Sequence, residues 1–153
     1  MVKNVFKKLG KKQKNNKGFS LVELIVVIAI MAVLVGVLAP QLMKYVEKSR
    51  EATDIQNCDS IASSLKAYYS DKEDQTADVE IVIEGTGITT GASDAAIVDS
   101  GLTGAKLKGK NWTSITITYA PSKGSVSYAI AGGEDAYYKV DDNDGGKFIK
   151  KEN

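Results

Sequence analysis

The chain has 153 residues, one cysteine (Cys58) and no histidine, and its formal net charge is +1. This length is enough for one domain and not comfortably for two. A single cysteine without histidine excludes an intrachain disulfide, a Cys/His metal site and a Cys–His catalytic pair. No pair of acidic residues has the context of a catalytic motif, so we expect neither an enzyme nor a cofactor.

The near-neutral net charge hides an uneven distribution. Residues 1–18 hold seven lysines and no acidic residue, which leaves a net charge of −6 for the rest of the chain. A basic segment in front of an apolar run usually stays on the cytoplasmic side of a membrane. Nucleic-acid binding is the other interpretation of a lysine-rich segment. Because the apolar run follows at once, DNA binding is not evident.

Residues 19–39 form an almost purely apolar run. As a helix they would span about 31 Å, close to the hydrocarbon thickness of a bilayer. A secretory signal peptide is the alternative, but Pro40 and a strongly helical pattern follow the run where a small-residue cleavage site would be needed. The run contains one charged residue, Glu23. Acidic residues inside membrane segments cost free energy and are usually functional.

The residues Gly18-Phe19-Ser20-Leu21-Val22-Glu23 resemble the type III leader cleavage site of type IV pilins and the related pseudopilins. The resemblance covers about residues 18–70. It implies that a prepilin peptidase removes residues 1–18 by cutting between Gly18 and Phe19, and that the same enzyme N-methylates Phe19. Glu23 and Pro40 would then be the fifth and twenty-second residues of the mature chain, as in the family.

Cleavage would create a new amine on Phe19, and this amine explains an acid in the apolar run. A buried carboxylate is tolerated only when it is paired. In a filament packed from these helices, Glu23 of one subunit is expected to form a salt bridge with the Phe19 amine of a neighbouring subunit. The alternative is that Glu23 only lies at the depth of the lipid headgroups.

The helix is predicted to continue from about residue 20 to residue 70. Residues 19–40 are expected to be the transmembrane and assembly part, and residues 41–74 the amphipathic part. Gly36 and Pro40 loosen the helix, and Pro40 is expected to kink or end it. The resemblance implies that this region can stretch or melt on assembly.

Spacings of three and four residues define the predicted apolar face of the amphipathic part. We assign to this face Leu42, Val46, Ala52, Ile55, Cys58, Ile61, Ala62, Leu65, Tyr68 and Tyr69. The other positions are filled by the polar residues Lys48, Arg50, Glu51, Asp54 and Asp59. Cys58 is interpreted as a small buried apolar residue.

Residues 75–153 are predicted to form a globular β head. Apolar and polar residues alternate over 79–84, 114–119 and 126–130, and the last two segments form a hairpin around the turn at 120–124. One or two helical turns are expected at 93–98, and another strand from 138 returns through 148–149. The predicted fold class is α+β, in which the long helix packs on an antiparallel sheet of about four strands, as in the pilin roll.

The segment Asp141–Gly146 loosely resembles a calcium-binding loop. Asp141, Asn143 and Asp144 are its candidate ligands. Gly145 occupies a position where an EF-hand needs an oxygen ligand, and no helices flank the segment. A plain hairpin turn is therefore the preferred interpretation, and no metal is expected.

These features predict a structural protein, the major subunit of an extracellular type IV pilus. The subunit would cross the cytoplasmic membrane once and then join a surface filament. Its partners would be other pilin subunits, the prepilin peptidase/methyltransferase, the pilus assembly platform and, before assembly, the membrane. A pseudopilin of a type II secretion or competence system is one alternative. A membrane-tethered binding or adhesive domain is another, but Gly18-Phe19 and Glu23 favour assembly.

Overall fold

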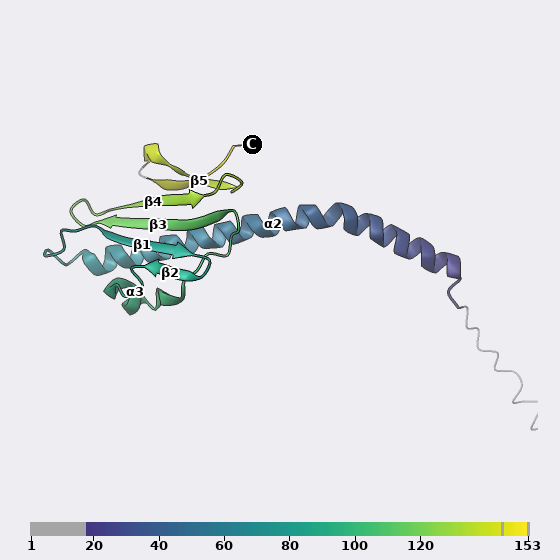
Figure 1. The fold of residues 1–153 in the computed structure, drawn as a ribbon, viewed down its shortest axis with the longest axis horizontal. Coiled ribbons are helices and arrows are strands. Elements are labelled where there is room, and N and C mark those ends of the chain that lie inside the picture. Colours follow the sequence, from purple (N-terminus) through teal and green to yellow (C-terminus); the bar gives the residue numbers. More distant parts are fainter. Residues whose placement is uncertain (1–17, 145, 153) are drawn as a thin grey trace, which may run out of the picture. The chain divides into compact units, whose positions relative to one another are not determined.

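A computed structural model describes residues 18–144 and 146–152, apart from the side chain of Asp144 (Figure 1). All of the predicted leader except Gly18 lies outside the described residues, as does Gly145. The chain separates into two compact units, with the boundary between Gln41 and Leu42. We call the second unit, residues 42–153, the head, and describe each unit by itself.

Helix α2 spans Leu21–Tyr69 and confirms the predicted long helix. It includes an 18-residue window with a mean hydropathy of 3.1, and none of that window is buried. Such a helix is long and apolar enough to cross a membrane. Pro40 lies inside α2 and does not end it.

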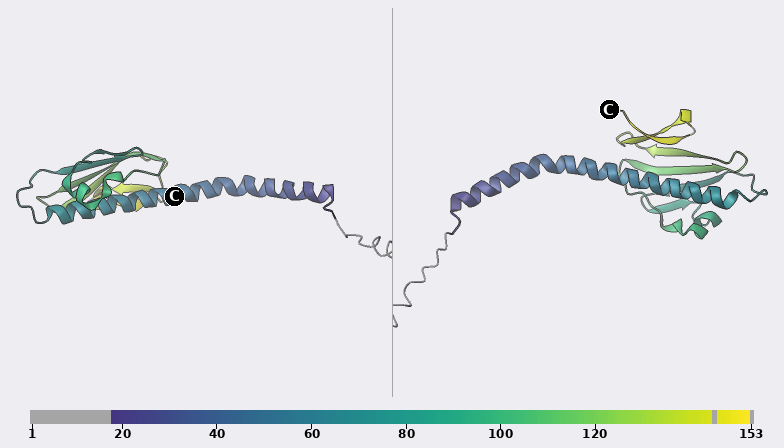
Figure 2. Two further views of the ribbon diagram at one scale, coloured as in Figure 1. Left: turned by 90° about the horizontal axis from the view of Figure 1, so that it is seen from below. Right: turned by 180° about the vertical axis from the view of Figure 1, so that it is seen from behind.

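The head contains a four-stranded antiparallel sheet in the order β2-β1-β3-β4. Its strands are β1 (Val79–Glu84), β2 (Gly87–Thr90), β3 (Trp112–Ala120) and β4 (Ser125–Gly132). The sheet lies along the part of α2 that belongs to the head (Figure 2). One helix on an antiparallel sheet is the predicted α+β class, which the structure confirms.

The core of the head joins one face of the sheet to one face of α2. Ile81 and Ile83 of β1 and Ile117 of β3 are at most 1% exposed, as their alternation with polar residues predicts. From α2, Ile61 and Leu65 are fully buried in the same cluster. Burial of aliphatic side chains at about 1.5–3 kcal/mol each therefore attaches the sheet to the helix.

The predicted face of α2 is correct from Ile55 onward and wrong before it. Glu51 and Asp54 were expected on the polar side, yet both are 0% exposed. Ala52 and Val46, which were assigned to the apolar face, are exposed instead. The reason is geometric, because residues three, four and seven positions apart share one side of a helix, and Glu51 and Asp54 lie seven and four positions before Cys58.

The sheet also differs from expectation in which strands it contains. Strands β5 (Tyr138–Asp141) and β6 (Lys147–Lys150) form a separate two-stranded sheet. The fourth strand of the main sheet is instead β2. This strand was not predicted, because its segment is rich in Gly and Thr. The β5–β6 hairpin contacts β4, where the rings of Phe148 and Tyr128 lie 4.9 Å apart between centroids.

Short helices complete the head. Helix α3 (Ala95–Ser100) confirms the predicted helical turns, and Asp94 caps it by accepting a hydrogen bond from the Ala96 N–H. The 3-10 turn η1 (Leu102–Gly104) follows α3, and η2 (Asp142–Asp144) joins β5 to β6.

Candidate functional site: the start of the long helix

The start of α2 is closed by a reciprocal capping arrangement. The Ser20 hydroxyl oxygen accepts hydrogen bonds from the backbone N–H of Val22 at 3.2 Å and of Glu23 at 3.4 Å. In return, the Ser20 backbone N–H donates to Glu23 Oε2 at 2.8 Å. This is a capping box, in which each side chain satisfies a backbone donor that the first helical turn leaves free.

Glu23 therefore has a role within its own chain as well as the one expected between subunits. The carboxylate lies in the first turn of α2, where the helix dipole favours negative charge. This role within the chain was not predicted, although Ser-x-x-Glu before an apolar run is the sequence signature of a capping box. The salt bridge to a neighbouring subunit stays a prediction.

The expected cleavage junction lies just before the helix. Gly18 and Phe19 precede the first residue of α2, and Phe19 is 82% exposed. Among the described residues, and apart from its chain neighbours, nothing lies within 4 Å of the Cβ position at Gly18. Both residues of the predicted junction are therefore exposed, and in this chain the Phe19 nitrogen is an amide nitrogen.

The apolar part of α2 is exposed on every side. Its large apolar side chains range from 45% exposed at Val27 to 76% at Leu21. Apart from its chain neighbours and the backbone of its own helix, no described residue lies within 4 Å of the Cβ position at Gly36. A helix that is apolar all round must be covered, either by lipid or by other helices.

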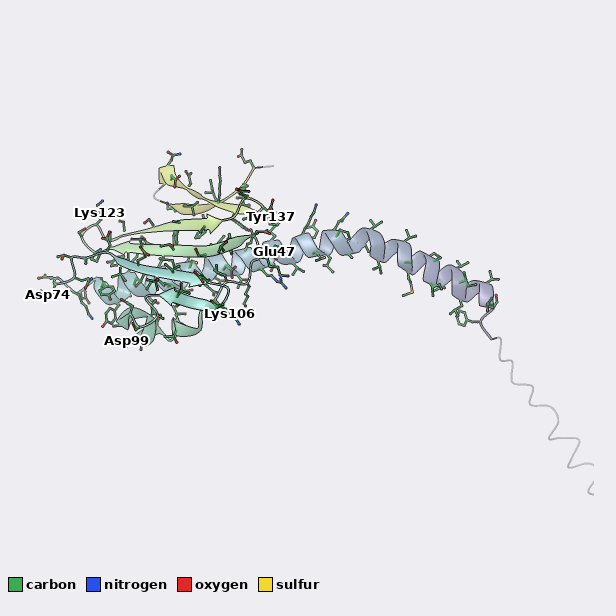
Figure 3. The ribbon with its side chains drawn as sticks, viewed as in Figure 1. Glu47, Asp74, Asp99, Lys106, Lys123 and Tyr137 are labelled. Atoms are coloured by element: carbon green, nitrogen blue, oxygen red, sulfur yellow. The ribbon has the colours of Figure 1, made fainter. Side chains whose placement is uncertain are left out.

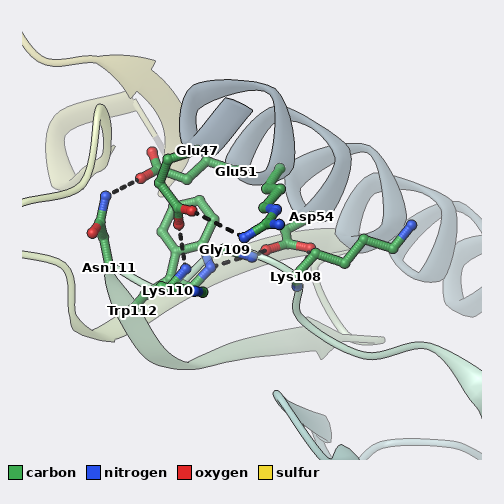
Figure 4. Close-up of polar contacts among 9 residues, drawn as sticks. Glu47, Glu51, Asp54, Lys108, Gly109, Lys110, Asn111 and Trp112 are labelled. Atoms are coloured by element: carbon green, nitrogen blue, oxygen red, sulfur yellow. Dashed lines mark hydrogen bonds and ion pairs between the residues drawn. The ribbon is translucent and has the colours of Figure 1, made fainter. Parts of the chain in front are cut away.

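A second arrangement of polar groups joins the segment before β3 to the part of α2 that belongs to the head (Figure 4). Asp54 Oδ1 accepts from the backbone N–H of Lys108 at 2.8 Å, and Oδ2 accepts from that of Gly109 at 2.7 Å. Oδ2 also accepts from Trp112 Nε1 at 3.1 Å. A carboxylate with three donors is compensated for its burial.

Glu51 binds two further segments from the same side of the helix. Its Oε1 accepts from Asn111 Nδ2 at 2.7 Å, and its Oε2 accepts from the Tyr137 N–H at 2.8 Å. Burial raises the pKa of the Glu51 carboxyl above its ordinary value of 4.5, and these hydrogen bonds oppose that shift without cancelling it.

Glu47 completes the set one turn earlier. It accepts a hydrogen bond from the Lys110 backbone N–H, and its other oxygen lies 3.6 Å from the Arg50 guanidinium. We call Glu47, Glu51 and Asp54 the carboxylate clamp. Most of its hydrogen-bond donors are backbone N–H groups, including those of residues 108–110, which indicates that the clamp positions the segment 108–112 on the helix.

The candidate calcium ligands lie in a tight turn. Asp141 Oδ1 accepts from the Asn143 N–H at 2.9 Å, and the Asp141 carbonyl oxygen accepts from the Gly146 N–H at 3.0 Å. The Asp144 side chain and Gly145 lie outside the described residues. Within residues 18–144 and 146–152, no group of three His, Cys, Asp or Glu residues could hold a metal ion.

Cys58 lies on the buried face of α2 and is 0% exposed. Burial raises the pKa of its thiol to about 12, with a smaller contribution from the charges of Asp54 and Asp59. The thiol therefore stays protonated at neutral pH and unreactive. This confirms the interpretation of Cys58 as a small buried residue.

Comparison with known proteins agrees with these features. A family model described as the prokaryotic N-terminal methylation motif matches residues 13–39. The fimbrial protein EcpC of Eikenella corrodens is 26% identical over 80% of this chain and 86% of its own length. No solved structure matches the chain.

Two further relatives match shorter stretches. The type IV major pilin protein PilA of Myxococcus xanthus is 29% identical over 38% of this chain and 26% of its own length. The prepilin peptidase-dependent protein A of Clostridium perfringens is 38% identical over 40% of this chain and 46% of its own length. The chain thus spans less than half of either of these two relatives.

The matched motif includes Gly18, Phe19, Glu23 and Gly36, and it ends one residue before Pro40. The long apolar helix and the antiparallel sheet that follows it are the fold expected of pilins. The chain therefore carries a prepilin-type N-methylation motif and is similar to type IV pilins in its long apolar helix. The relatives named above include a fimbrial protein and a major pilin, which are structural proteins.

Proposed function

We propose that the chain is the major subunit of an extracellular type IV pilus. A prepilin peptidase cuts after Gly18 and methylates the new amine of Phe19. The subunit then waits in the cytoplasmic membrane until the assembly platform adds it to a filament. The observation that carries this proposal is the methylation motif at residues 13–39 on a helix whose apolar part is exposed on every side.

This function assigns a role to each segment of the chain. Residues 1–18 are the leader, and residues 19–40 are the membrane and assembly helix. Residues 41–74 carry the amphipathic part of α2, and residues 75–153 form the globular β part of the head. Gly36 and Pro40 mark the part of the helix that stretches when the subunit leaves the membrane, because Pro40 has no N–H to donate within the helix.

In the filament, Glu23 pairs with the Phe19 amine of a neighbouring subunit. The apolar surface of α2 leaves lipid and is covered by the same surface of other copies. A charge moved into such a bundle needs a counter-charge, since an unpaired buried charge costs several kcal/mol. A subunit that still carries its leader has no Phe19 amine and fails this requirement.

A pseudopilin of a type II secretion or competence system would share all the features of the helix. Two of the relatives, a fimbrial protein and a major pilin, favour the pilus. Filaments that appear on cells only together with a secretion or competence machine would instead assign the chain to the pseudopilins. A membrane-tethered domain would show no filament at all.

Mass spectrometry of filaments sheared from cells tests the proposal. The subunit is expected to begin at Phe19 and to carry one added methyl group. Electron microscopy of the same sample should show filaments that disappear when the gene is deleted. A mature chain that begins near Pro40 would mean ordinary signal-peptide removal and would overturn the proposal.

A further inference from the structure

The head carries two exposed surfaces of opposite charge. The first, which we call the lysine loop, comprises residues 106–110 between η1 and β3 and exposes Lys106, Lys108 and Lys110. The second, the acidic turn, comprises residues 71–78 between α2 and β1 and exposes Asp71, Glu73, Asp74 and Asp78.

The carboxylate clamp holds the lysine loop by its backbone and leaves its side chains free. The N–H groups of Lys108, Gly109 and Lys110 all donate to clamp carboxylates. Within the described residues, no carboxylate forms an ion pair with the three ammonium groups. Figure 4 shows the Lys108 side chain extending away from the clamp. The loop is thus held in place before any partner binds, which lowers the entropic cost of binding.

The acidic turn is unpaired as well. Its one cation, Lys72, places its ammonium 3.4 Å from the centre of the Tyr68 ring. In the part of the chain that the structure describes, no side chain pairs with the four carboxylates of the turn. The cation–π contact therefore keeps Lys72 on an aromatic surface and leaves the turn with an uncompensated negative charge.

The two surfaces lie at opposite ends of the head. Figure 3 shows Asp74 at one end and Lys106 toward the other. The clamp residue Asp54 and the end of α2 at Tyr69 are separated along the helix by about 22 Å at the usual rise per residue. Because the distance is so large, one head cannot join its own two surfaces.

We propose that the lysine loop of one copy binds the acidic turn of a second copy, so that heads join end to end along the filament. The inference rests on the proposed filament function. Three ammonium groups face four carboxylates, a complementarity that selects and orients a partner. A contact between two different surfaces of identical chains repeats from copy to copy, and it builds an open filament when the rotation between copies does not close a ring.

Charge reversal in the full chain tests the contact. Asp74→Lys and Lys108→Glu are each expected to lower the yield of sheared filaments several-fold, and the two together to restore it. The matched controls Asp99→Lys in α3 and Lys139→Glu in β5 are also at exposed positions and are expected to leave the yield unchanged. Because exposed charges are screened by salt, the single variants should also fall apart at lower ionic strength than the unaltered filament.

Cross-linking gives a second measurement that does not depend on yield. Filaments of an Asp74→Cys, Lys106→Cys chain should form a ladder of covalent dimers, trimers and longer oligomers on oxidation. A chain with only one of the two introduced cysteines should stay monomeric, because the proposed contact places no cysteine opposite it and the native Cys58 is buried. Normal filaments with no ladder, and no rescue in the double charge variant, would overturn this inference and leave the pilus proposal standing.

Two other outcomes are also decisive. Absence of filaments from the unaltered chain would overturn the pilus proposal and this contact with it. Retention of DNA by filaments that depends on Lys106, Lys108 and Lys110, without any ladder, would assign the lysine loop to nucleic acid and overturn the contact between copies.

Discussion

At the scale of single residues, two carboxylates in α2 have different structural roles. Glu23 lies at an exposed helix start and binds the backbone of its own first turn. Glu51 lies inside the head and binds Asn111 and Tyr137, which are far from it in sequence. Burial acts against the charge of Glu51, so its ionisation costs free energy of folding, while its hydrogen bonds lower that cost.

Glu51 predicts a pH dependence of stability. Because its pKa is raised in the folded state, the folded head holds the proton more tightly than the unfolded chain. The free energy of unfolding should therefore fall as pH rises from 4.5 through the raised pKa. Glu51→Gln should remove this component, which urea unfolding of the unaltered and variant heads at a series of pH values would measure. The same slope in both would show that Glu51 does not titrate in that range.

Glu51→Leu is the contrasting variant. Leucine leaves the Tyr137 N–H and the Asn111 amide without an acceptor, at a cost of about 1–3 kcal/mol for each buried group. Glutamine still offers an oxygen to Tyr137, and Asn111 can turn its own oxygen toward the new amide. The expected order of stability at neutral pH is therefore Glu51→Gln well above Glu51→Leu.

Variants at Glu23 and Ser20 separate its two roles. Glu23→Gln keeps an oxygen for the Ser20 N–H but removes the charge, whereas Ser20→Ala keeps the charge and weakens the cap by about 1 kcal/mol. If the Phe19 amine of a neighbour needs the charge, Glu23→Gln should abolish filaments while processed subunits accumulate in the membrane. Ser20→Ala should still assemble. Fractionation of cells into membranes and sheared filaments measures both.

The opposite pattern at the same two positions would identify capping as the main role of Glu23. Normal filaments from Glu23→Gln, with weak assembly from Ser20→Ala, would remove the salt bridge from the proposed function. Cleavage after Gly18 should persist in either case, because neither change alters the junction.

At the scale of elements, regular patterns of side chains were predictable and long-range polar contacts were not. The helix and the β3–β4 hairpin follow from periods near 3.6 and of 2 in their apolar residues. The clamp breaks the helical pattern with charged residues whose partners lie more than fifty positions away. Strand β2 was missed because its four residues, Gly87–Thr90, are too few to show alternation.

The loop between η1 and β3 must approach α2 closely, and Gly109 allows it. A Cβ at this position would lie 2.9 Å from Trp112 Nε1 and 3.0 Å from Asp54 Oδ2. We expect Gly109→Ala to lower the free energy of unfolding by about 1–3 kcal/mol through overpacking. Gly104→Ala, which meets nothing within 4 Å, is the control and should stay within about 0.5 kcal/mol. Thermal melts that rank the two equally would contradict a tight contact at the clamp.

The β5–β6 hairpin shows a similar use of glycine at the edge of the main sheet. Gly146 has a φ of 75°, a value that favours glycine, and a Cβ there would lie 3.0 Å from the Tyr128 nitrogen. The hairpin thus meets the backbone of β4, the strand at one edge of the sheet order. Covering an edge strand in this way hinders uncontrolled pairing with other chains.

At the scale of the whole molecule, the residues that form the folded core and the residues of the apolar helix lie in different segments of the chain. Every buried residue of the described chain lies at Glu51 or beyond. The apolar part of α2 therefore contributes no side chain to the core of the head. Covering this apolar surface lowers the free energy of the subunit in lipid or in a filament. The folded head is stabilised instead by its own core and by the clamp.

This division predicts that a fragment of residues 42–153 folds without the rest of the chain. The fragment keeps the core, the clamp and Trp112, which is the one tryptophan of the chain and only 5% exposed. Circular dichroism should show helix and strand, and tryptophan emission should be that of a buried ring that shifts to the red on unfolding.

A shorter fragment, residues 55–153, is the matched comparison because it keeps the apolar face of α2 but loses Glu47, Glu51 and Asp54. It should be less stable by several kcal/mol, since the Trp112 Nε1–H and the backbone donors of residues 108–110 lose their acceptors. Equal melting temperatures for the two fragments would show that the clamp contributes little, and an insoluble or strand-free longer fragment would show that the head does not fold by itself.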